Sequence, residues 1–442
     1  MKKLRTVLLI VMVAMLVMQP VFAVEPAEAN VIQAQDQQDN PAGWAAWDVQ
    51  MMSTYRLGNE QNYVQFTGVI QGSHYLSIQE ELEKAFGVTD ASKVDAQQKM
   101  TRGQVIEELF DIIQLTLQPE EQDALKYFED NELIRGNGKG YALESECTVQ
   151  ELLVFTRRVY EFLVYARGMD AKGAFWKVSD EDNTVYLLGS IHATDGSVFP
   201  MSKAILDGFT DSEFLFVEAN TLVPNQEEAA YMQEKMMYSD GTTIDKVISK
   251  EVYDKYAAVM QAAGMPPEVY DILKPWAAAS VAMVLNMSAS SIQASMGIDV
   301  YFLNLAYMNA KPIFEMEGIK FQTDMFESFT PELQEMYLAG SLAGGTESNE
   351  NLLKMMQSWK AGDVEMLESI VFGQEAESEA EREFNEKLFD IRNANMVVKC
   401  QEMLTKDTEN DYFVVVGAGH MINYNGIVKE LIKLGYTVEQ VK

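Results

Sequence analysis

The sequence is short of basic residues, cysteines and histidines, and the shortage of positive charge excludes one class of partner at once. Its 442 residues contain 34 Lys and Arg against 67 Asp and Glu, which gives a net charge of −33. A chain with this charge cannot neutralise the phosphates of a nucleic acid, so we expect no DNA or RNA partner. A solvated acidic surface on an exported protein is the simplest expectation for this composition.

Several familiar motifs are also missing. The sequence has no His-Glu-x-x-His, no Gly-x-Ser-x-Gly, no P-loop and no Cys-x-x-Cys, which argues against the enzymes built on those motifs. Gly417-Ala418-Gly419 begins like a dinucleotide-binding fingerprint, but Ile422 stands where the third glycine belongs. The two cysteines, Cys147 and Cys400, fall in different expected domains. We therefore predict that both are free, although an exported chain could pair them.

The one long apolar run lies at the N-terminus. Basic residues precede the run from Val7 to Met18, and Val21-Phe22-Ala23 follows it. This pattern predicts a secretory signal peptide over residues 1–23, because the run is too short to span a bilayer. Residues 24–41 have few large apolar side chains, which predicts a flexible leader. The protein is thus expected to be secreted or at the cell surface, with no membrane span in the mature chain.

Residues 42–168 have the periodicity of helices separated by glycine-containing turns. Thr101 to Gln104 and Thr148 to Glu151 each form a Thr-x-x-Gln/Glu capping box at a helix start. His74 is expected to be a surface or capping residue. With the glycine turn at residues 136–140, this region resembles S-layer homology repeats, which implies binding to cell-wall polysaccharide. The capping boxes alone also explain these positions, so a purely structural helical domain is the alternative.

Residues 173–442 have the pattern of an α/β domain with a sheet. The runs 175–178 and 184–188 predict a hairpin, and 213–218, 313–317, 412–416 and 436–438 predict further strands. Residues from about 226 to 373 predict a large, mainly helical insertion, and 374–404 predict one long helix. The methionine-rich helix faces are expected to be core or a plastic apolar groove. We therefore expect an α/β sheet domain preceded by a smaller, mostly helical domain.

Two strands of this domain end in the same way. Gly189 and Gly417 each follow an apolar run and each precede a histidine by three residues, His192 and His420. Ligands gather at the carboxyl ends of parallel strands, so the histidines are expected to meet there. Glu218 ends a third strand and is the expected third partner. The hypothesis is that these three bind a divalent metal whose bound water attacks a carbonyl.

The alternative is that each histidine only makes hydrogen bonds in a loop and each glycine serves a turn. In the metal hypothesis, the glycines allow a sharp backbone turn and leave room for substrate. Asp299 is expected either at the site or as a helix N-cap. Glu317, with Gln322 nearby, is expected either to orient a ligand histidine or to pair with Arg392.

These motifs resemble the TraB/GumN family, which includes the PrgY and Tiki proteins. The matching segments are Gly189 to His192, Val217-Glu218, Gly297 to Asp299, Lys311-Pro312, Met316-Glu317 with Gln322, Arg392-Asn393 with Met396, and Gly417 to His420. The resemblance implies a metal-dependent hydrolase of peptide or amide bonds, with the histidines and the glutamate at its centre. It also implies manganese, cobalt or zinc as the ion. Asn423 departs from a glycine that the family often has.

The sequence therefore predicts an exported hydrolase that acts on a peptide or protein substrate. Glu218 is expected either to bind the metal or to act as general base. Two alternatives stay open at this point. One is a non-catalytic protein that sequesters peptides in the methionine-rich insertion, and the other is a metal-free, esterase-type hydrolase that uses a histidine as base.

Overall fold

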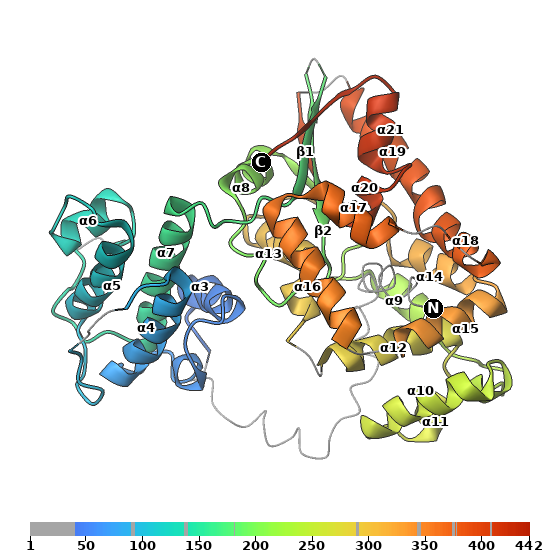
Figure 1. The fold of residues 1–442 in the computed structure, drawn as a ribbon, viewed down its shortest axis with the longest axis horizontal. Helices are drawn as coiled ribbons and strands as arrows, with labels where there is room; N and C mark the ends of the chain where they lie inside the picture. The colour runs from blue at the N-terminus through green and yellow to red at the C-terminus, as the bar shows by residue number, and fades with distance from the viewer. Residues whose placement is uncertain are drawn as a thin grey trace. The chain divides into compact units, whose positions relative to one another are not determined.

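The computed structural model describes residues 40–442 except 90–92, 137–139, 181, 289–290, 343–345, 374–375, 377 and 407–408. The expected signal peptide, nearly all of the expected leader and the middle of the glycine turn lie outside the described residues. The described chain divides into two compact units, one ending at Asp170 and the other spanning Ala171–Lys442. Figure 1 shows the elements of both units.

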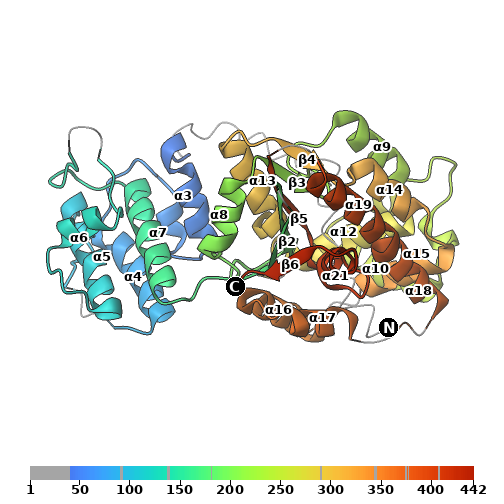
Figure 2. The same ribbon diagram turned by 90° about the horizontal axis from the view of Figure 1, so that it is seen from above.

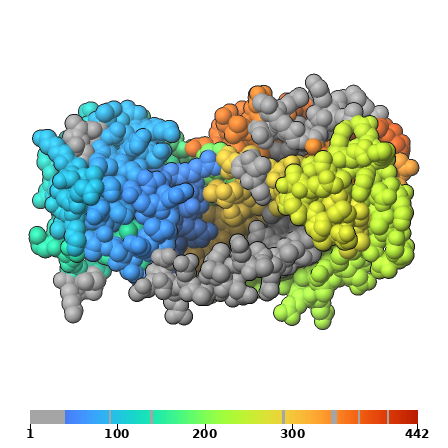
Figure 3. Space-filling view, turned by 90° about the horizontal axis from the view of Figure 1, so that it is seen from below, coloured from blue at the N-terminus to red at the C-terminus, as the bar shows by residue number. Residues whose placement is uncertain are grey.

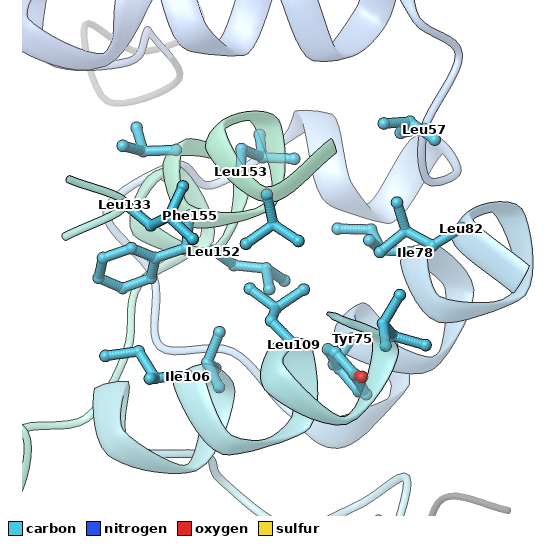
Figure 4. Close-up of a cluster of buried hydrophobic side chains, with 14 of the residues drawn as sticks. Leu57, Tyr75, Ile78, Leu82, Ile106, Leu109, Leu133, Leu152, Leu153 and Phe155 are labelled. Carbon is cyan, nitrogen blue, oxygen red and sulfur yellow. The ribbon is translucent and has the colours of Figure 1, made fainter. Parts of the chain in front are cut away.

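The N-terminal unit is helical and has its own hydrophobic core. Its elements are α3 (Gly43–Thr54), the 3-10 turn η2 (Glu60–Tyr63), α4 (Gly72–Phe86), α5 (Arg102–Leu117), α6 (Ala124–Asp130) and α7 (Val149–Ala166). Helix α7 packs against both α3 and α5. Figure 4 shows the side chains between these helices, among them Tyr75, Ile78, Ile106, Leu109, Leu152 and Leu153. All six are buried.

Three helices of this unit begin in the same way, which is one more than the sequence analysis found. Each of α4, α5 and α7 has a capping box, formed by Gln71 with His74, Thr101 with Gln104, and Thr148 with Glu151. The two boxes predicted from the sequence are therefore confirmed. His74 is a capping residue as well, because its Nδ1 accepts from the Gln71 N–H at 3.2 Å.

The three helix starts are joined in a ring by backbone hydrogen bonds. Gly72 N–H donates to Gln98 O (2.9 Å), Arg102 N–H to Ser145 O (2.9 Å), and Val149 N–H to Gly68 O (3.0 Å). Each helix start thus bonds to the turn before the next, and the third returns to the first. The buried side chains of Ile70, Met100 and Cys147 occupy the equivalent place in the three copies.

The second unit contains a six-stranded mixed sheet, so the predicted α/β class is confirmed. The strands are β1 (Ala174–Ser179), β2 (Thr184–Ser190), β3 (Phe214–Val217), β4 (Ile313–Glu315), β5 (Asp411–Gly417) and β6 (Thr437–Gln440). Their order is β4-β3-β5-β2-β1-β6. Strands β4, β3, β5 and β2 are parallel, whereas β1 is antiparallel to both of its neighbours. The predicted hairpin corresponds to β1 and β2.

Helices cover both faces of this sheet (Figure 2). Helices α8 (Lys203–Asp211) and α13 (Ile298–Met308) pack on one face, where Phe209 and Phe302 contact Phe413 of β5. Helix α19 (Ile391–Leu404) contacts α21 (Ile427–Lys433), and α20 (Ala418–Ile422) contacts β2. Strand β5 is central and has no exposed face, which explains why Tyr412 to Val416 is continuously apolar.

The region from 226 to 373 is mainly helical but includes β4, which belongs to the sheet. Its helices are α9 (Gln226–Met236), α10 (Lys250–Ala262), α11 (Pro267–Tyr270), α12 (Pro275–Ser288), α13, α14 (Ile319–Glu327), α15 (Pro331–Ser341), α16 (Thr346–Ala361) and α17 (Val364–Phe372), with the 3-10 turns η3 (Ile244–Lys246) and η4 (Ala294–Met296). Figure 3 shows the surface formed by α10 and α11 in yellow-green. Among the described residues, no helix is long and apolar enough to cross a membrane.

The long helix expected over 374–404 begins later and has an internal irregularity. Helix α18 (Glu379–Asn385) is followed directly by a π-helical turn, η5 (Glu386–Asp390), and then by α19. In this turn the Ile391 N–H donates to the carbonyl of Glu386, five residues back. Such a turn holds one residue more than an α-helical turn, so it changes which side chains face the sheet.

Candidate functional site

Four neighbouring parallel strands each deliver one ionisable side chain to the same edge of the sheet. His192 follows β2, His420 follows β5, Glu218 follows β3 and Glu317 follows β4. Because parallel strands end at a common edge, residues far apart in the sequence become neighbours there. The predicted meeting of His192, His420 and Glu218 is therefore what the structure shows.

Glu218 lies at the centre of this group. Its Oε1 is 3.7 Å from His192 Nε2 and 3.8 Å from His420 Nε2. The same oxygen accepts a hydrogen bond of 2.6 Å from the Gly417 N–H. The exposed fractions of the three residues are 6% for His192, 6% for Glu218 and 3% for His420. Both imidazoles thus present Nε2 to one buried carboxylate oxygen.

Each histidine is held through its other ring nitrogen. His192 Nδ1 lies 3.2 Å from Asp299 Oδ1, a close charged contact in which neither of these buried atoms forms a hydrogen bond. His420 Nδ1 forms a hydrogen bond of 2.7 Å with Asn393 Oδ1. Asp299 is in the first turn of α13, whose N-cap is Gly297, so the alternative that made Asp299 the N-cap is wrong. Contacts of this kind fix the orientation of an imidazole.

Arg392 connects two carboxylates of the site. Its Nη2 donates to Glu218 Oε2 at 2.6 Å and to Glu317 Oε2 at 2.7 Å, and its Nε donates to Glu317 Oε1 at 2.8 Å. Only 2% of the arginine is exposed. Of the two alternatives for Glu317, pairing with Arg392 is thus the one observed. Gln322 Nε2 lies 3.3 Å from Glu218 Oε2 and 3.4 Å from Glu317 Oε2.

Burial and these contacts change the protonation of the site. Burial alone would raise the pKa of Glu218, but Arg392 and both histidines outweigh it and hold that pKa below its ordinary value. Burial, reinforced by the Arg392 charge, lowers the pKa of His420 to about 3. Burial would also lower the pKa of His192, but Asp299 and Glu218 outweigh it and raise that pKa. At neutral pH, Glu218 is therefore charged and His420 is neutral.

The two glycines of the Gly-x-x-His motifs have different roles. The predicted sharp turn off the strand is seen at Gly417, which ends β5 and is the N-cap of α20. At Gly189 the predicted turn is wrong, because this residue lies inside β2. A Cβ on Gly189 would lie 2.9 Å from Ala418 Cα, so this glycine lets α20 pack against β2. A Cβ on Gly417 would lie 3.1 Å from His192 Nε2 and 3.2 Å from Glu218 Oε1. A side chain at 417 would therefore crowd these two groups, and the room for substrate expected from the glycines stays a prediction.

The residues present are of the type that binds a divalent metal. Within the described residues, no group of three or more His, Cys, Asp or Glu side chains is already arranged as a metal site. Even so, imidazole nitrogen and carboxylate oxygen are suitable donors for manganese, cobalt and zinc. Both histidines have Nδ1 in contact with another side chain, and Gly417 has no side chain to come between their Nε2 atoms and Glu218. Arg392 occupies the second oxygen of Glu218, which leaves Oε1 as the available donor.

Some groups of the site could not be found from the motifs. The Gly417 N–H that binds Glu218 has no side chain to reveal it. Asn423, the departure from the family pattern, is buried and forms a turn in which its Oδ1 accepts from the Tyr424 N–H at 2.7 Å. Two residues after Asn423, the Asn425 side-chain NH2 donates to Asp390 Oδ1 at 2.8 Å. The only signal in the sequence for this loop was an asparagine three residues after His420.

Comparisons with known proteins identify the second unit. A profile of the TraB/PrgY/gumN family matches residues 174–440. The uncharacterized protein YbaP of Escherichia coli strain K12 is 23% identical over 236 residues, which are 53% of this chain and 83% of that protein. YbaP of Shigella flexneri gives the same figures. No solved structure matches the chain.

The family match begins after the N-terminal helical unit. No comparison supports the resemblance of that unit to S-layer repeats, so binding to the cell wall stays a prediction. The match includes every strand and all of the residues that meet at the strand ends. Through residues 174–440, the chain belongs to the TraB/PrgY/gumN family.

Proposed function

We propose that the second unit is a metal-dependent hydrolase that cleaves a peptide or amide bond. His192, His420 and Glu218 would hold one divalent ion, with manganese, cobalt and zinc as the candidates. The observation that carries the proposal is the approach of two imidazole Nε2 atoms to one oxygen of Glu218, at 3.7 Å and 3.8 Å. When bound, such an ion lowers the pKa of a coordinated water and polarises a carbonyl group.

The charge of the site supports a dication. Glu218, Glu317 and Asp299 carry three formal negative charges, and Arg392 carries one positive charge. Two negative charges are therefore uncompensated in a buried position, which is costly unless a cation or a proton balances them. The pKa of His192 agrees with this excess of negative charge, because Asp299 and Glu218 raise it against the opposing effect of burial.

The environment of Glu218 favours the role of ligand over that of general base. A general base works best when its pKa is near the working pH, whereas the pKa of Glu218 is lowered. A carboxylate that stays ionised is a good metal ligand at all ordinary pH values. Arg392 and the Gly417 N–H hold this carboxylate in place, and Asp299 and Asn393 orient the imidazoles.

Substrate access requires movement, since the three central residues are 3–6% exposed. A peptide can reach them only when the segments that cover the site move apart. Peptide and amide substrates are proposed on the strength of the family resemblance and of a centre suited to carbonyl chemistry.

The test is metal content by elemental analysis of the mature chain after loading with manganese, cobalt or zinc. We expect about one ion per chain, lost in His192→Ala and His420→Ala. His74→Ala is the matched control, because His74 caps a helix in the other unit. Gly417→Ala should also lose the ion, since its Cβ would occupy the space beside His192 Nε2. Absence of an ion from the wild-type chain under all three loadings would refute the proposal.

A metal-free hydrolase is the second candidate, and one contact favours it. His192 lies 3.2 Å from Asp299, as a histidine base lies beside the carboxylate that orients it. This candidate predicts hydrolysis that survives chelation and is lost in Asp299→Asn. If a peptide binds equally well to the wild-type chain and to His192→Ala, without hydrolysis by either, the protein sequesters peptides instead.

We also propose that the protein is exported and that its N-terminal unit contacts the cell wall. The basic N-terminus followed by an apolar run supports export. The three similar helix starts support a repeat-based module. Co-sedimentation of the full mature chain with purified cell walls tests the second statement, and a chain that stays in the supernatant contradicts it.

A further inference from the structure

We propose that Asp390 is a positioning residue that sets the tautomer of His420 through two intervening amides, those of Asn393 and Asn425. The proposal deepens the function proposed above, on which it rests only for the role of His420 as a ligand. None of the motifs in the sequence includes Asp390 or Asn425.

Four side chains form one continuous line of hydrogen bonds from the buried site toward the surface. His420 Nδ1 is 2.7 Å from Asn393 Oδ1. Asn393 Nδ2 donates to Asn425 Oδ1 at 3.1 Å and to the Asn425 carbonyl at 3.3 Å. Asn425 Nδ2 donates to Asp390 Oδ1 at 2.8 Å. The inner pair of this line is buried, with His420 3% and Asn393 1% exposed. The outer pair, Asn425 and Asp390, is half-buried.

The chemistry of these groups gives the line a direction. An ionised carboxylate only accepts, so the NH2 of Asn425 must face Asp390 and its Oδ1 must face Asn393. The NH2 of Asn393 then faces Asn425, and the Asn425 carbonyl, which can only accept, supports the same orientation. Asn393 Oδ1 therefore faces His420 and accepts the proton of Nδ1–H. The proton is thus at Nδ1, and the lone pair of Nε2 faces Glu218.

The two histidines of the site thus depend on carboxylates in different ways. Asp299 contacts His192 directly, whereas the carboxylate behind His420 is two amides away. Asp390 ends the π-helical turn and lies two residues before Arg392. Side chains two residues apart on a helix face different sides, so Asp390 contacts Asn425 while Arg392 contacts Glu218.

The outer end of the line is accessible. Asp390 lines a surface groove of about 650 Å³ together with Arg382, Glu386, Ile391 and Tyr424. The Tyr424 hydroxyl donates to Asp390 Oδ2 at 2.8 Å, the oxygen that Asn425 does not use. A substitution at Asp390 therefore alters the line without placing any new atom in the buried site.

The test is ¹⁵N NMR of the full mature chain labelled at histidine, recorded free of metal at mildly alkaline pH. The chain has three histidines, so each can be assigned by substitution. We expect the proton of wild-type His420 at Nδ1. His74 is an internal reference of the opposite tautomer, because its Nδ1 accepts from a backbone N–H. In Asp390→Ala, His420 should lose its uniform Nδ1–H signal and show a population protonated at Nε2.

One matched variant should keep the wild-type signal. Tyr424→Phe removes only the other hydrogen bond to Asp390 and leaves the carboxylate that accepts from Asn425. Asn425→Ala should reproduce Asp390→Ala, which guards against a folding defect peculiar to one variant. An unchanged His420 tautomer in folded Asp390→Ala and Asn425→Ala would overturn the proposal.

A metal titration separates this proposal from the one on which it rests. If manganese binds the wild-type chain, Asp390→Ala should bind it about 10-fold more weakly. A chain that binds no metal but shows the tautomer change supports the line of hydrogen bonds and refutes the metal site. A chain that binds metal, with His420 unchanged in Asp390→Ala, supports the metal site and refutes the role of Asp390.

Discussion

The two units of this protein place charge in opposite ways. In the N-terminal unit the charged groups lie around an apolar core, as in the ion pair of Arg157 and Asp48, whose side chains are 18% and 11% exposed. In the sheet unit Arg392 and Glu317 are each 2% exposed. Burial of apolar groups stabilises the first unit, whereas the second contains buried charges that stabilise it only as a complete set. Groups arranged for chemistry are expected to carry such a cost.

Each unit also contains one buried free cysteine, Cys147 in the first and Cys400 in the second. Labelling of these thiols during urea unfolding therefore reports on each unit separately. The predictions below use this pair of reporters.

The largest expected effect follows removal of the buried guanidinium. Arg392→Met leaves Glu218 and Glu317 buried without their main partner, which should destabilise the sheet unit by about 3–5 kcal/mol. Arg157→Met in the other unit should cost less, about 1–3 kcal/mol, because the Asp48 and Glu161 side chains that lose their partner are 11% and 21% exposed. The measurement is the urea midpoint for labelling of Cys400 and Cys147, with chelator present. Equal losses in the two variants would remove the contrast between the units.

A cavity in the N-terminal core should destabilise the N-terminal unit and leave the sheet unit unchanged. Leu109 is fully buried among the helices of that unit. Leu109→Ala should destabilise the unit by about 2–5 kcal/mol through lost contacts and the cavity left behind. Cys147 should then become reactive at lower urea, while Cys400 and the metal content remain as in the wild-type chain. A matching shift for Cys400 would show that the units unfold together.

Acid should weaken the sheet unit through His420. Its pKa is about 3 when folded against an ordinary value of 6.5, so the unfolded chain takes up a proton first as the pH falls. Stability present above pH 6.5 is therefore lost on acidification, by up to about 1.4 kcal/mol per pH unit. The raised pKa of His192 acts in the opposite sense, giving stability that is present at low pH and lost as the pH rises.

Comparison with His420→Gln between pH 6.5 and 4.5 isolates this contribution. The difference in unfolding free energy between the wild-type chain and the variant should change with pH, without metal, for the sheet unit alone. A constant difference would show that His420 is not held neutral.

The smallest expected effect is that of a thiol reagent on the native protein. Burial raises the pKa of Cys400 to about 12 and also raises the pKa of Cys147. At pH 8 both thiols are then protonated and covered, so neither should react until its unit unfolds. Rapid labelling of Cys400 in the folded chain would show that the sheet unit opens around α19.

The sequence predicted the sheet and its centre well for a physical reason. A buried strand is a run of apolar residues, and a group at its carboxyl end has a predictable place once the strands are parallel. This is how His192, His420 and Glu218 could be brought together from positions far apart. The pairing of Arg392 with Glu317 was one of two alternatives, because the sequence alone does not show which side of the helix that carries Arg392 faces the sheet.

Other features depend on contacts that no local pattern reveals. The start of α4 has Gln71 and His74 in place of Thr and Gln or Glu, so its capping box has no familiar signature. It also needs Gly72, where a Cβ would lie 2.2 Å from the Asp95 carbonyl. The contact of Asn425 with Asp390 joins residues that are 35 positions apart in the sequence. The turn predicted at Gly189 was wrong because close packing by Ala418, and not backbone conformation, requires that glycine.

The ring of three helix starts limits how the N-terminal unit can change in evolution. A solenoid exposes an end at which another repeat can stack, so its length can vary. Here the Val149 N–H already bonds to the carbonyl of Gly68, and the last copy closes on the first. A fourth copy would have no vacant position, and loss of one copy would leave one helix-start N–H and one turn carbonyl without partners. The number of copies is therefore fixed at three, and the unit can be gained, lost or exchanged only as a whole.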